Sequence, residues 1–307
     1  MGRVLLIDGS NYLHRGHWAI VGQSGKKEPL TTSDGFATSG IKGMLGIIIA
    51  DIHVLRPDAI VVCYDSKGAP NWRTLEYPMY KKGPGRVAAK LKAKETGNNV
   101  YEQLKPVQRI LRAMGIKQIG VLGEEADDII GTLAVKFSGE GHEVLIGSTD
   151  KDFGSLVNRK IKIVESTTRR ILGVKAIEEK FGVKPSKMVE FLMLQGDKVD
   201  NIPGVAKCAG GTASKWLNTY GDIKTLLANI ENLTPVLKAN LKVARKHFKM
   251  TRRLITLRTT IEHDLTIENC GFAKPKYRLL ERLCSELEMI QTHSKIVNVL
   301  ERIHQWS

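Results

Sequence analysis

Cysteine is scarce in this chain, and no two cysteines lie close together in sequence. The four residues are Cys63, Cys208, Cys270 and Cys284. A zinc site or a redox pair needs closely spaced cysteines, so the spacing argues against both. We interpret the four as reduced thiols and expect a cytoplasmic protein.

Long apolar runs are also absent. The first run, residues 3–7, ends at Asp8 and is far too short for a signal sequence or a membrane span. The sequence has no internal repeat and no low-complexity segment. Because no apolar run is long enough to enter a membrane, we expect no membrane partner.

Positive charge, in contrast, is in excess. The 307 residues have a formal net charge of +15 and a pI near 9.6. An excess of Lys and Arg on this scale usually indicates a polyanionic partner, with nucleic acid ahead of a membrane surface. A generically soluble basic protein is the alternative that charge alone leaves open.

Short apolar runs alternate with helical stretches in the first half of the chain. The runs 4–7, 59–64, 116–122 and 144–146 predict buried strands, and 41–55, 101–114 and 126–137 have helical spacing. This alternation is typical of an α/β fold with a mostly parallel sheet flanked by helices. Helical spacing then continues at 174–181, 185–195, 212–220, 222–229, 235–245 and 276–304. We expect a core of residues 1–172 and a helical region of residues 173–307.

Residues 66–99 fit neither pattern. Their Gly and Pro residues interrupt regular structure, and the segment carries many cations and few acids. A long insertion of this kind in a compact domain is either functional or a solvated loop, and the segment itself does not decide between the two.

Acidic residues follow the predicted strands. They occur after the first, second, third and fourth apolar runs, at Asp8, at Asp65, at Glu124, Glu125, Asp127 and Asp128, and at Asp150 and Asp152. The carboxyl ends of parallel strands share one edge of a sheet, which is where ligands bind in such folds. The sequence thus predicts a cluster of carboxylates at this edge.

Carboxylates so close together need a cation to offset their repulsion. Oxygen ligands without His or Cys suit Mg²⁺ or Mn²⁺, and a pair of such ions is the arrangement used to cleave phosphodiester bonds. Taken singly, each acid also reads as a turn residue or a helix cap. The coincidence of four segments in an otherwise basic chain favours a metal-dependent nuclease.

A second acidic pair, Asp197 and Asp200, opens a Gly-bearing turn between two predicted helices. The turn continues through residues 201–205 to Thr212. Backbone N–H groups at a helix N-terminus suit a DNA phosphate, although such corners are also common structural joints.

These motifs resemble the 5′ nuclease family, which includes the 5′-3′ exonuclease domain of bacterial DNA polymerase I and the free-standing flap endonucleases of phages and bacteria. The matching stretches, in the order of the family, are 5–15, 65–73, 80–81, 123–128, 148–152 and 196–205. The resemblance implies a PIN-like nuclease core, a helical arch over the active site formed by the 66–99 segment, and a helix-hairpin-helix DNA-binding region near residues 190–220. It also implies a bacterial cell or a phage-infected host.

The resemblance assigns roles as well. It implies a first metal set of Asp8, Asp65, Glu125, Asp127 and Asp128, and a second set of Asp150, Asp152, Asp197 and Asp200. Asp8, Asp65, Asp128 and Asp150 are its catalytic acids, and Lys81 is a catalytic cation at the base of the arch. Arg73, Lys81, Lys82 and Arg86 are expected to contact DNA, together with the hairpin residues Gly204, Lys207, Gly210, Gly211 and Thr212.

The hairpin departs from the family pattern. Family members usually have glycines where this chain has Lys207 and Ala209, and a lysine where it has Gly211. Glycines there allow positive φ and close approach to phosphate or to a monovalent cation. The K⁺ ion that the family would place at this turn is therefore uncertain here, and Lys207 is a candidate substitute for its charge.

We expect a monomeric 5′-3′ exonuclease and flap endonuclease that uses two Mg²⁺ ions, with Mn²⁺ as a substitute, in DNA replication, repair or primer removal. Its partner would be DNA with a 5′ flap or a single-stranded 5′ end, and an RNA/DNA hybrid is a further candidate. Two alternatives remain, a ribonuclease with the same acidic sheet edge and a catalytically silent DNA-binding protein.

Overall fold

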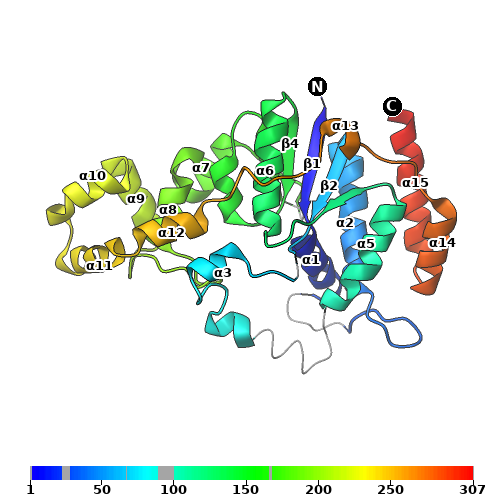
Figure 1. Cartoon of the computed structure of the whole chain (residues 1–307), viewed down its shortest axis with the longest axis horizontal. Coiled ribbons are helices and arrows are strands. Elements are labelled where there is room, and N and C mark those ends of the chain that lie inside the picture. Colours follow the sequence, from blue (N-terminus) through cyan, green and yellow to red (C-terminus); the bar gives the residue numbers. More distant parts are fainter. Residues whose placement is uncertain (1, 23–27, 67, 89–99, 166–167, 307) are drawn as a thin grey trace.

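A six-stranded sheet forms the centre of the molecule (Figure 1). This computed structural model describes residues 2–22, 28–66, 68–88, 100–165 and 168–306. The first five strands in spatial order are parallel and the last is antiparallel. In that order they are β3 (Lys117–Ile119), β2 (Ala59–Cys63), β1 (Arg3–Asp8), β4 (Glu143–Gly147), β5 (Ile161–Val164) and β6 (Ile171–Leu172). The expected mostly parallel α/β sheet is confirmed.

Alternate residues of β1 enter two different cores. Leu5 and Ile7 pack with helices on one face, whereas Val4 and Leu6 pack on the other. The first face is covered by α1 (Gly9–Val21), α2 (Ser39–Leu55) and α5 (Leu104–Ala113), and the second by α6 (Ala126–Gly139). Because side chains alternate along a strand, an uninterrupted apolar run is what a strand covered on both faces requires.

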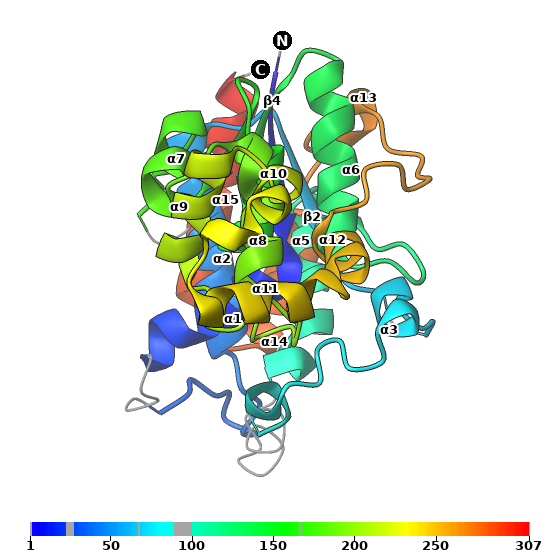
Figure 2. The ribbon, with the colours of Figure 1, turned by 90° about the vertical axis from the view of Figure 1, so that its left-hand side faces the viewer.

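A helical region extends from the sheet on the side of β5 and β6 (Figure 1), and its helices face the viewer in Figure 2. Its elements are α7 (Val174–Phe181), α8 (Met188–Gln195), α9 (Gly210–Tyr220), α10 (Ile223–Ala228), α11 (Pro235–Arg245) and α12 (Phe248–Ile255). The turn between α8 and α9 lies where the hairpin is expected. Gly196 and Gly204 approach so closely there that a Cβ on either would lie within 2.5 Å of the other's backbone nitrogen.

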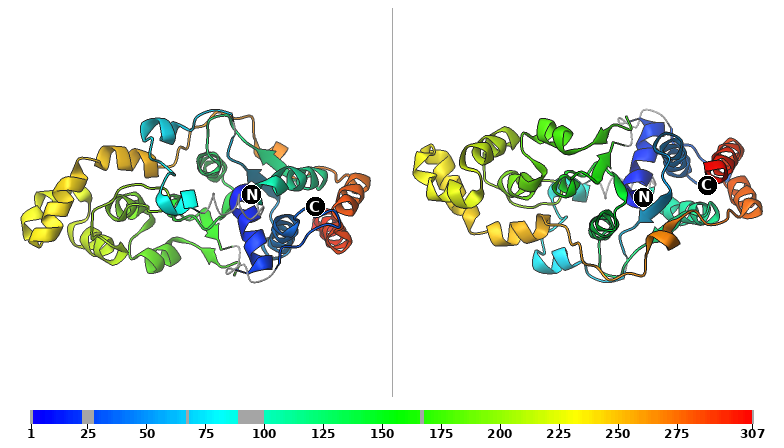
Figure 3. Two further views of the ribbon diagram at one scale, coloured as in Figure 1. Left: turned by 90° about the horizontal axis from the view of Figure 1, so that it is seen from below. Right: turned by 90° about the horizontal axis from the view of Figure 1, so that it is seen from above.

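The end of the chain returns to the sheet. After α13 (Ile267–Cys270), α14 (Tyr277–Glu286) packs against α5, and α15 (Ile290–Trp306) packs against α2. These helices lie at the opposite end of the elongated molecule from α11 (Figure 3). Residues 173–307 therefore do not form one helical region, because the last two helices share a core with the sheet.

The single long helix expected at 276–304 is wrong. The structure breaks it between α14 and α15, where Glu288 has a φ of 54°. The Glu288 carboxylate accepts a hydrogen bond from the backbone N–H of Ser33 at 2.9 Å. This contact comes from a segment 255 residues away, so helical spacing alone did not reveal the break.

The expected arch is described only in part. Residues 72–76 form α3 (Trp72–Glu76), and residues 84–88 are helical. Residues 67 and 89–99 lie outside the described residues, and with them the middle of the expected arch. Within the described ranges, no helix has both the length and the apolar character needed to cross a bilayer.

Candidate active site

The acids predicted from the strand ends do lie along one edge of the sheet. Asp8 ends β1, and Asp65 and Asp150 follow β2 and β4, which are the two neighbours of β1 in the sheet. Each acid also caps a helix start. Asp8 accepts a hydrogen bond from the backbone N–H of Asn11, Asp65 from that of Ala126, and Asp150 from that of Asp152, each at 2.9 Å. Capping and clustering are therefore compatible, because parallel strands deliver three helix starts to one edge.

The acids of this edge repel one another. Burial and the charges of Asp65 and Asp150 together raise the pKa of Asp8 from 3.8 to about 7, against the hydrogen bond from Asn11. The pKa of Asp127 lies well above its ordinary value because of burial and the charges of Asp150 and Asp8. Burial and Asp197 likewise raise the pKa of Asp150, and burial and Asp150 raise that of Asp152.

This cluster has the chemistry of a cation site. Its donors are all carboxylate oxygens, and Oδ1 of Asp127 and Oε2 of Glu124 are buried without a hydrogen-bond partner among the described residues. Buried acceptors without partners and mutually raised pKa values are what a hard divalent cation would relieve. As the side chains stand, no three His, Cys, Asp or Glu residues in the described ranges are arranged to hold such an ion.

Several of these acids form ion pairs with Lys and Arg side chains of the same chain. Lys81 is ion-paired with Glu125, Arg86 with Asp200 at 2.7 Å, and Lys151 with Asp197 at 2.9 Å. The arch segment supplies Lys81 and Arg86. The backbone N–H of Lys81 also donates to the carbonyl of Asp200 at 2.9 Å, so the base of the arch is attached to the hairpin loop.

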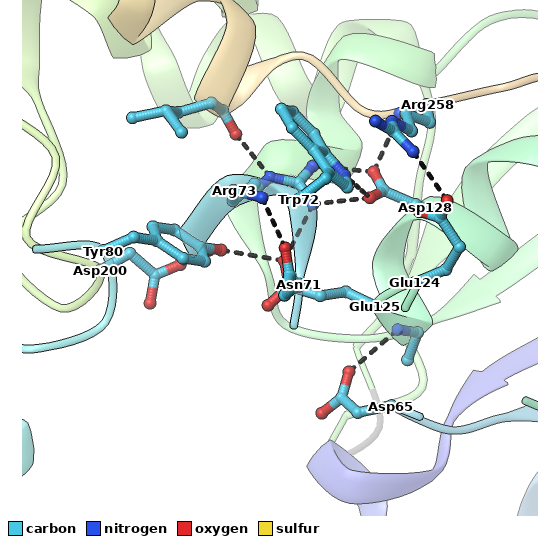
Figure 4. A network of polar contacts seen from close by, with 12 residues as sticks. Asp65, Asn71, Trp72, Arg73, Tyr80, Glu124, Glu125, Asp128, Asp200 and Arg258 are labelled. Carbon is cyan, nitrogen blue, oxygen red and sulfur yellow. Dashed lines mark hydrogen bonds and ion pairs between the residues drawn. The ribbon is translucent and has the colours of Figure 1, made fainter. Parts of the chain in front are cut away.

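Asp128 lies apart from the cluster, in a buried network (Figure 4). Its two oxygens accept hydrogen bonds from both terminal nitrogens of Arg73, at 2.6 and 2.7 Å. They also accept from the indole N–H of Trp72 at 3.0 Å and the backbone N–H of Arg258 at 2.9 Å. The Asp128 side chain is fully buried, so this arrangement makes it an anchor for three segments, and its role as a cation ligand stays a prediction.

Arg73 does not lie where a DNA phosphate can reach it. The residue is 2% exposed, and besides Asp128 it donates to Glu125 and to the carbonyl of Leu254, each at 2.8 Å. The expected phosphate contact of Arg73 is not supported by this placement. An arginine in this motif is expected to bind phosphate. Here four acceptor atoms, which belong to Glu125, Asp128 and Leu254, hold its side chain in the protein interior.

The remaining expected DNA contacts are at the surface. Lys82 is exposed and Arg86 is half-buried at the start of the arch, and Lys207 is exposed in the hairpin. Lys207 has a φ of 64°, the left-handed conformation for which glycine is usual. Gly204 lies in the tight turn, and Gly210, Gly211 and Thr212 begin α9.

Sequence reasoning missed two residues of the site. The Tyr80 hydroxyl donates to Glu125 at 3.0 Å and lies 3.3 Å from an Asp200 oxygen, so it joins the two halves of the cluster. Arg258 pairs with Glu124 at 2.7 Å. Tyr80 precedes Lys81 in a matching motif and could have been considered, whereas nothing local distinguishes Arg258.

The acid edge and its surrounding cations define a nuclease of the α/β class. Residues 3–182 match the family model for the 5′-3′ exonuclease N-terminal resolvase-like domain, and residues 183–278 match that for the 5′-3′ exonuclease C-terminal SAM fold. The chain belongs to the 5′-3′ exonuclease family.

Relatives agree with this assignment. A 5′-3′ exonuclease of Aquifex aeolicus is 30% identical, with 100% of this chain and 99% of that protein covered. DNA polymerase I of Pseudomonas aeruginosa is 33% identical over 93% of this chain, which corresponds to 30% of the polymerase.

Solved structures share the fold at lower identity. A bacteriophage T5 flap endonuclease, in a pseudo-enzyme-product complex with DNA and metal ions, is 18% identical with a TM-score of 0.67, covering 97% of this chain and 99% of that chain. The catalytic core of Rad2 in complex with a DNA substrate is 16% identical with a TM-score of 0.60, covering 98% and 91%.

Proposed function

We propose that this 5′-3′ exonuclease acts on DNA with a 5′ flap or a single-stranded 5′ end, and that its products carry a 5′-phosphate and a 3′-hydroxyl. The observation that carries the proposal is the convergence of Asp8, Asp127 and Asp150 at the carboxyl edge of the sheet, with their pKa values raised by burial and by one another's charge. The complex of the T5 neighbour with DNA and metal ions and that of the Rad2 neighbour with a DNA substrate support it.

Two Mg²⁺ ions are the proposed cofactors, with Mn²⁺ as a substitute. Asp8, Asp65, Glu125 and Asp127 would hold one ion, and Asp150, Asp152, Asp197 and Asp200 the other. Such ions supply Lewis acidity and positive charge at the scissile phosphate. Asp128 contributes by fixing α6, since its carboxylate is already engaged by Arg73 and Trp72.

Side chains around the cluster would orient the substrate. Lys81 reaches Glu125 from the arch, so a phosphate placed at the acids lies within the field of its ammonium group. The Tyr80 hydroxyl contacts both Glu125 and Asp200 and so fixes the position of one carboxylate relative to the other. Lys82 and Arg86 are placed for the single-stranded 5′ end, and the hairpin from Gly204 to Thr212 for duplex backbone.

The wider role we propose is in replication, repair or primer removal, with a monomer as the active form. An RNA/DNA hybrid is the second substrate to test, since primer removal would present one. Light scattering of the purified chain would check the monomer.

The direct test uses 5′-labelled flap DNA. Wild-type protein with Mg²⁺ should release a short labelled product, whose length on a sequencing gel locates the cut relative to the junction, and chelation with EDTA should abolish it. A matched RNA flap distinguishes the ribonuclease alternative. The proposal fails if the flap DNA is not cut under conditions in which the protein binds it.

A further inference from the structure

One stretch of the helical region contains no acidic residue. Between Glu231 and Glu262 the chain has neither Asp nor Glu, although it carries eight Lys and Arg residues. They are Lys238, Lys242, Arg245, Lys246, Lys249, Arg252, Arg253 and Arg258. A solvated helix usually mixes charges of both signs, so this composition points to a negatively charged partner.

Four of these cations lie on one face of the α11–α12 segment. Lys242, Arg245, Lys246 and Lys249 occupy positions i, i+3, i+4 and i+7. At about 100° per residue they fall within a sector of roughly 100°. Lys246 and His247, between the two helices, keep right-handed helical φ and ψ, so the periodicity continues across the junction.

The opposite face of the segment is buried. Leu241, Ala244 and Phe248 pack into the core, while all four cations are exposed. None of the four makes an ion pair with a described residue. Other cations of the stretch do, since Arg252 pairs with Glu190, Arg253 with Glu76 and Arg258 with Glu124. The four charges are therefore available to a ligand.

A hollow of about 800 Å³ lies beside this face, between α8, α10 and α12. Arg245 and Lys249 border it from one side and Lys224 from the other, while Glu190 and Asp222 also line it. A concave surface bordered by cations from three helices can contact a phosphate chain over several units, which a single exposed lysine cannot.

The segment is also fixed to the hairpin. The Asn240 side-chain amide donates to the carbonyl of Ala206 at 2.8 Å, and the Thr251 hydroxyl to that of Pro203 at 3.3 Å. Both acceptors belong to the turn that also contains Lys207. At about 100° per residue, Asn240 and Thr251 lie on the side of the segment opposite to the four cations, so these contacts fix the orientation of the cationic face and leave it turned away from the hairpin turn.

We propose that Lys242, Arg245, Lys246 and Lys249 form a second duplex-binding surface that contacts DNA phosphates. The proposal rests on the DNA substrate proposed above. The four residues span about 10 Å at ~1.5 Å per residue, a length along which duplex DNA presents roughly six phosphates. The hairpin lacks the lysine that the family pattern would have at Gly211, and this surface adds positive charge elsewhere in the same helical region.

The test is a variant in which all four residues become glutamine, which removes the charges and keeps helix propensity. Binding to a 20-base-pair duplex and to a single strand of equal length is measured by fluorescence anisotropy between about 50 and 200 mM salt. The logarithmic salt slope for the duplex should fall by about two to four, and affinity at 100 mM salt by about tenfold or more. Single-strand affinity should change less than about threefold.

A matched control removes four exposed cations from the other end of the molecule. In it Lys274, Lys276, Arg278 and Lys295 become glutamine, which gives the same change in net charge. Its duplex slope should stay near that of the wild type. A milder variant, Lys242→Gln with Lys246→Gln, should produce about half the change in slope and covers the case in which four substitutions impair folding.

Three results would overturn the inference. They are an unchanged duplex slope, an equal loss in the control, and an equal loss for single-stranded DNA. Failure of the wild type to cleave any 5′ structure is a separate outcome. It would remove the proposed function and leave the duplex-binding measurement to decide this surface by itself.

Discussion

The ammonium group of Lys81 forms an ion pair with the carboxylate of Glu125, the N-cap residue at the start of α6. Burial lowers the pKa of Lys81, but the charges of Glu125, Asp200 and Asp127 outweigh it and hold the pKa above its ordinary value. The lysine is therefore charged where the scissile phosphate is proposed to bind. It also joins the arch to the acids, because its backbone N–H is bonded to Asp200.

Lys81→Ala should slow the bond-breaking step. One preorganised charge removed from a site of this kind lowers the rate by about 10²-fold or more. Flap affinity should change little because many other cations remain. Single-turnover cleavage of flap DNA at saturating protein measures the rate, and anisotropy measures affinity. Lys82→Ala is the control, expected to weaken binding more than it slows cleavage. Lower affinity with an unchanged rate would make Lys81 an ordinary arch contact.

Arg86→Ala should tighten metal binding. Arg86 neutralises Asp200 at 2.7 Å, so a cation entering this part of the cluster must compete with it. The pair is partly exposed, and its removal should raise Mg²⁺ affinity by only about two- to fivefold. Isothermal titration without DNA measures this directly. Lys82→Ala removes an equal charge that is exposed on the same segment, and an equal gain there would show a general charge effect.

Asp150→Asn and Asp128→Asn should differ in stability. Asp150 is surrounded by like charges, so its neutralisation should stabilise the metal-free protein or leave it unchanged while abolishing cleavage. Asp128 is buried and forms an ion pair with Arg73. Weakening that ion pair should lower the free energy of unfolding by about 3 kcal/mol. Urea unfolding in EDTA compares the two. Equal destabilisation would contradict the separation of cluster and anchor, and full turnover by Asp150→Asn would contradict the proposed cation site.

Lys207→Gly should weaken duplex binding without loss of stability. Its φ of 64° is unfavourable for lysine by roughly 1 kcal/mol, which glycine relieves while adding freedom to the unfolded chain. If Lys207 supplies charge to the hairpin, duplex affinity should fall about three- to tenfold. Wild-type affinity should differ less than twofold between Na⁺ and K⁺ at equal ionic strength. A strong K⁺ preference would show that the turn binds the ion itself.

A buried acid outside the site predicts a pH effect on stability. Asp51 in α2 accepts a hydrogen bond from the Tyr12 hydroxyl at 2.9 Å and lies 3.3 Å from Arg169. Burial raises the pKa of Asp51 from 3.8 to about 6, although Tyr12, Arg169 and Arg15 lower it. The folded chain then holds this proton up to about pH 6 and the unfolded chain only to about pH 4.

The unfolded state therefore binds fewer protons in this window, and the Asp51 contribution to the free energy of unfolding decreases as pH rises from about 4 to about 6. Asp51→Asn should remove it. The difference between wild type and variant, measured by urea unfolding at several pH values, should drop across this window by up to about 3 kcal/mol. A difference that is constant or rises with pH would show that Asp51 is ionised in the folded state.

The central strands and the acid edge were predictable because each has a local signal. The apolar runs at β1, β2 and β4 are unbroken, and the acids follow the strand ends. The strand at Ile161–Val164 was missed because a polar residue interrupts it, and that at Ile171–Leu172 because two residues form no pattern. The latter is defined by its pairing with β5.

The missed parts of the site have a similar cause. Arg73 and Asp128 stand in motifs that read as phosphate and cation sites. Leu254 and Arg258, which complete their network, are more than 120 residues away in sequence. No local sequence pattern reveals a partner so far away in the chain. A charged residue that is buried against such a partner then stabilises the fold instead of binding phosphate or a cation at the surface.

Both chain ends lie at the edge of the sheet opposite to the acids, β1 starting there and α15 ending there (Figure 1). A purification tag, a fluorophore or a surface linker attached at either end would therefore lie on the side of the molecule away from the acids, where it would not obstruct bound nucleic acid. Single-molecule work on this nuclease could tether the protein by one terminus and leave the entire cutting side free.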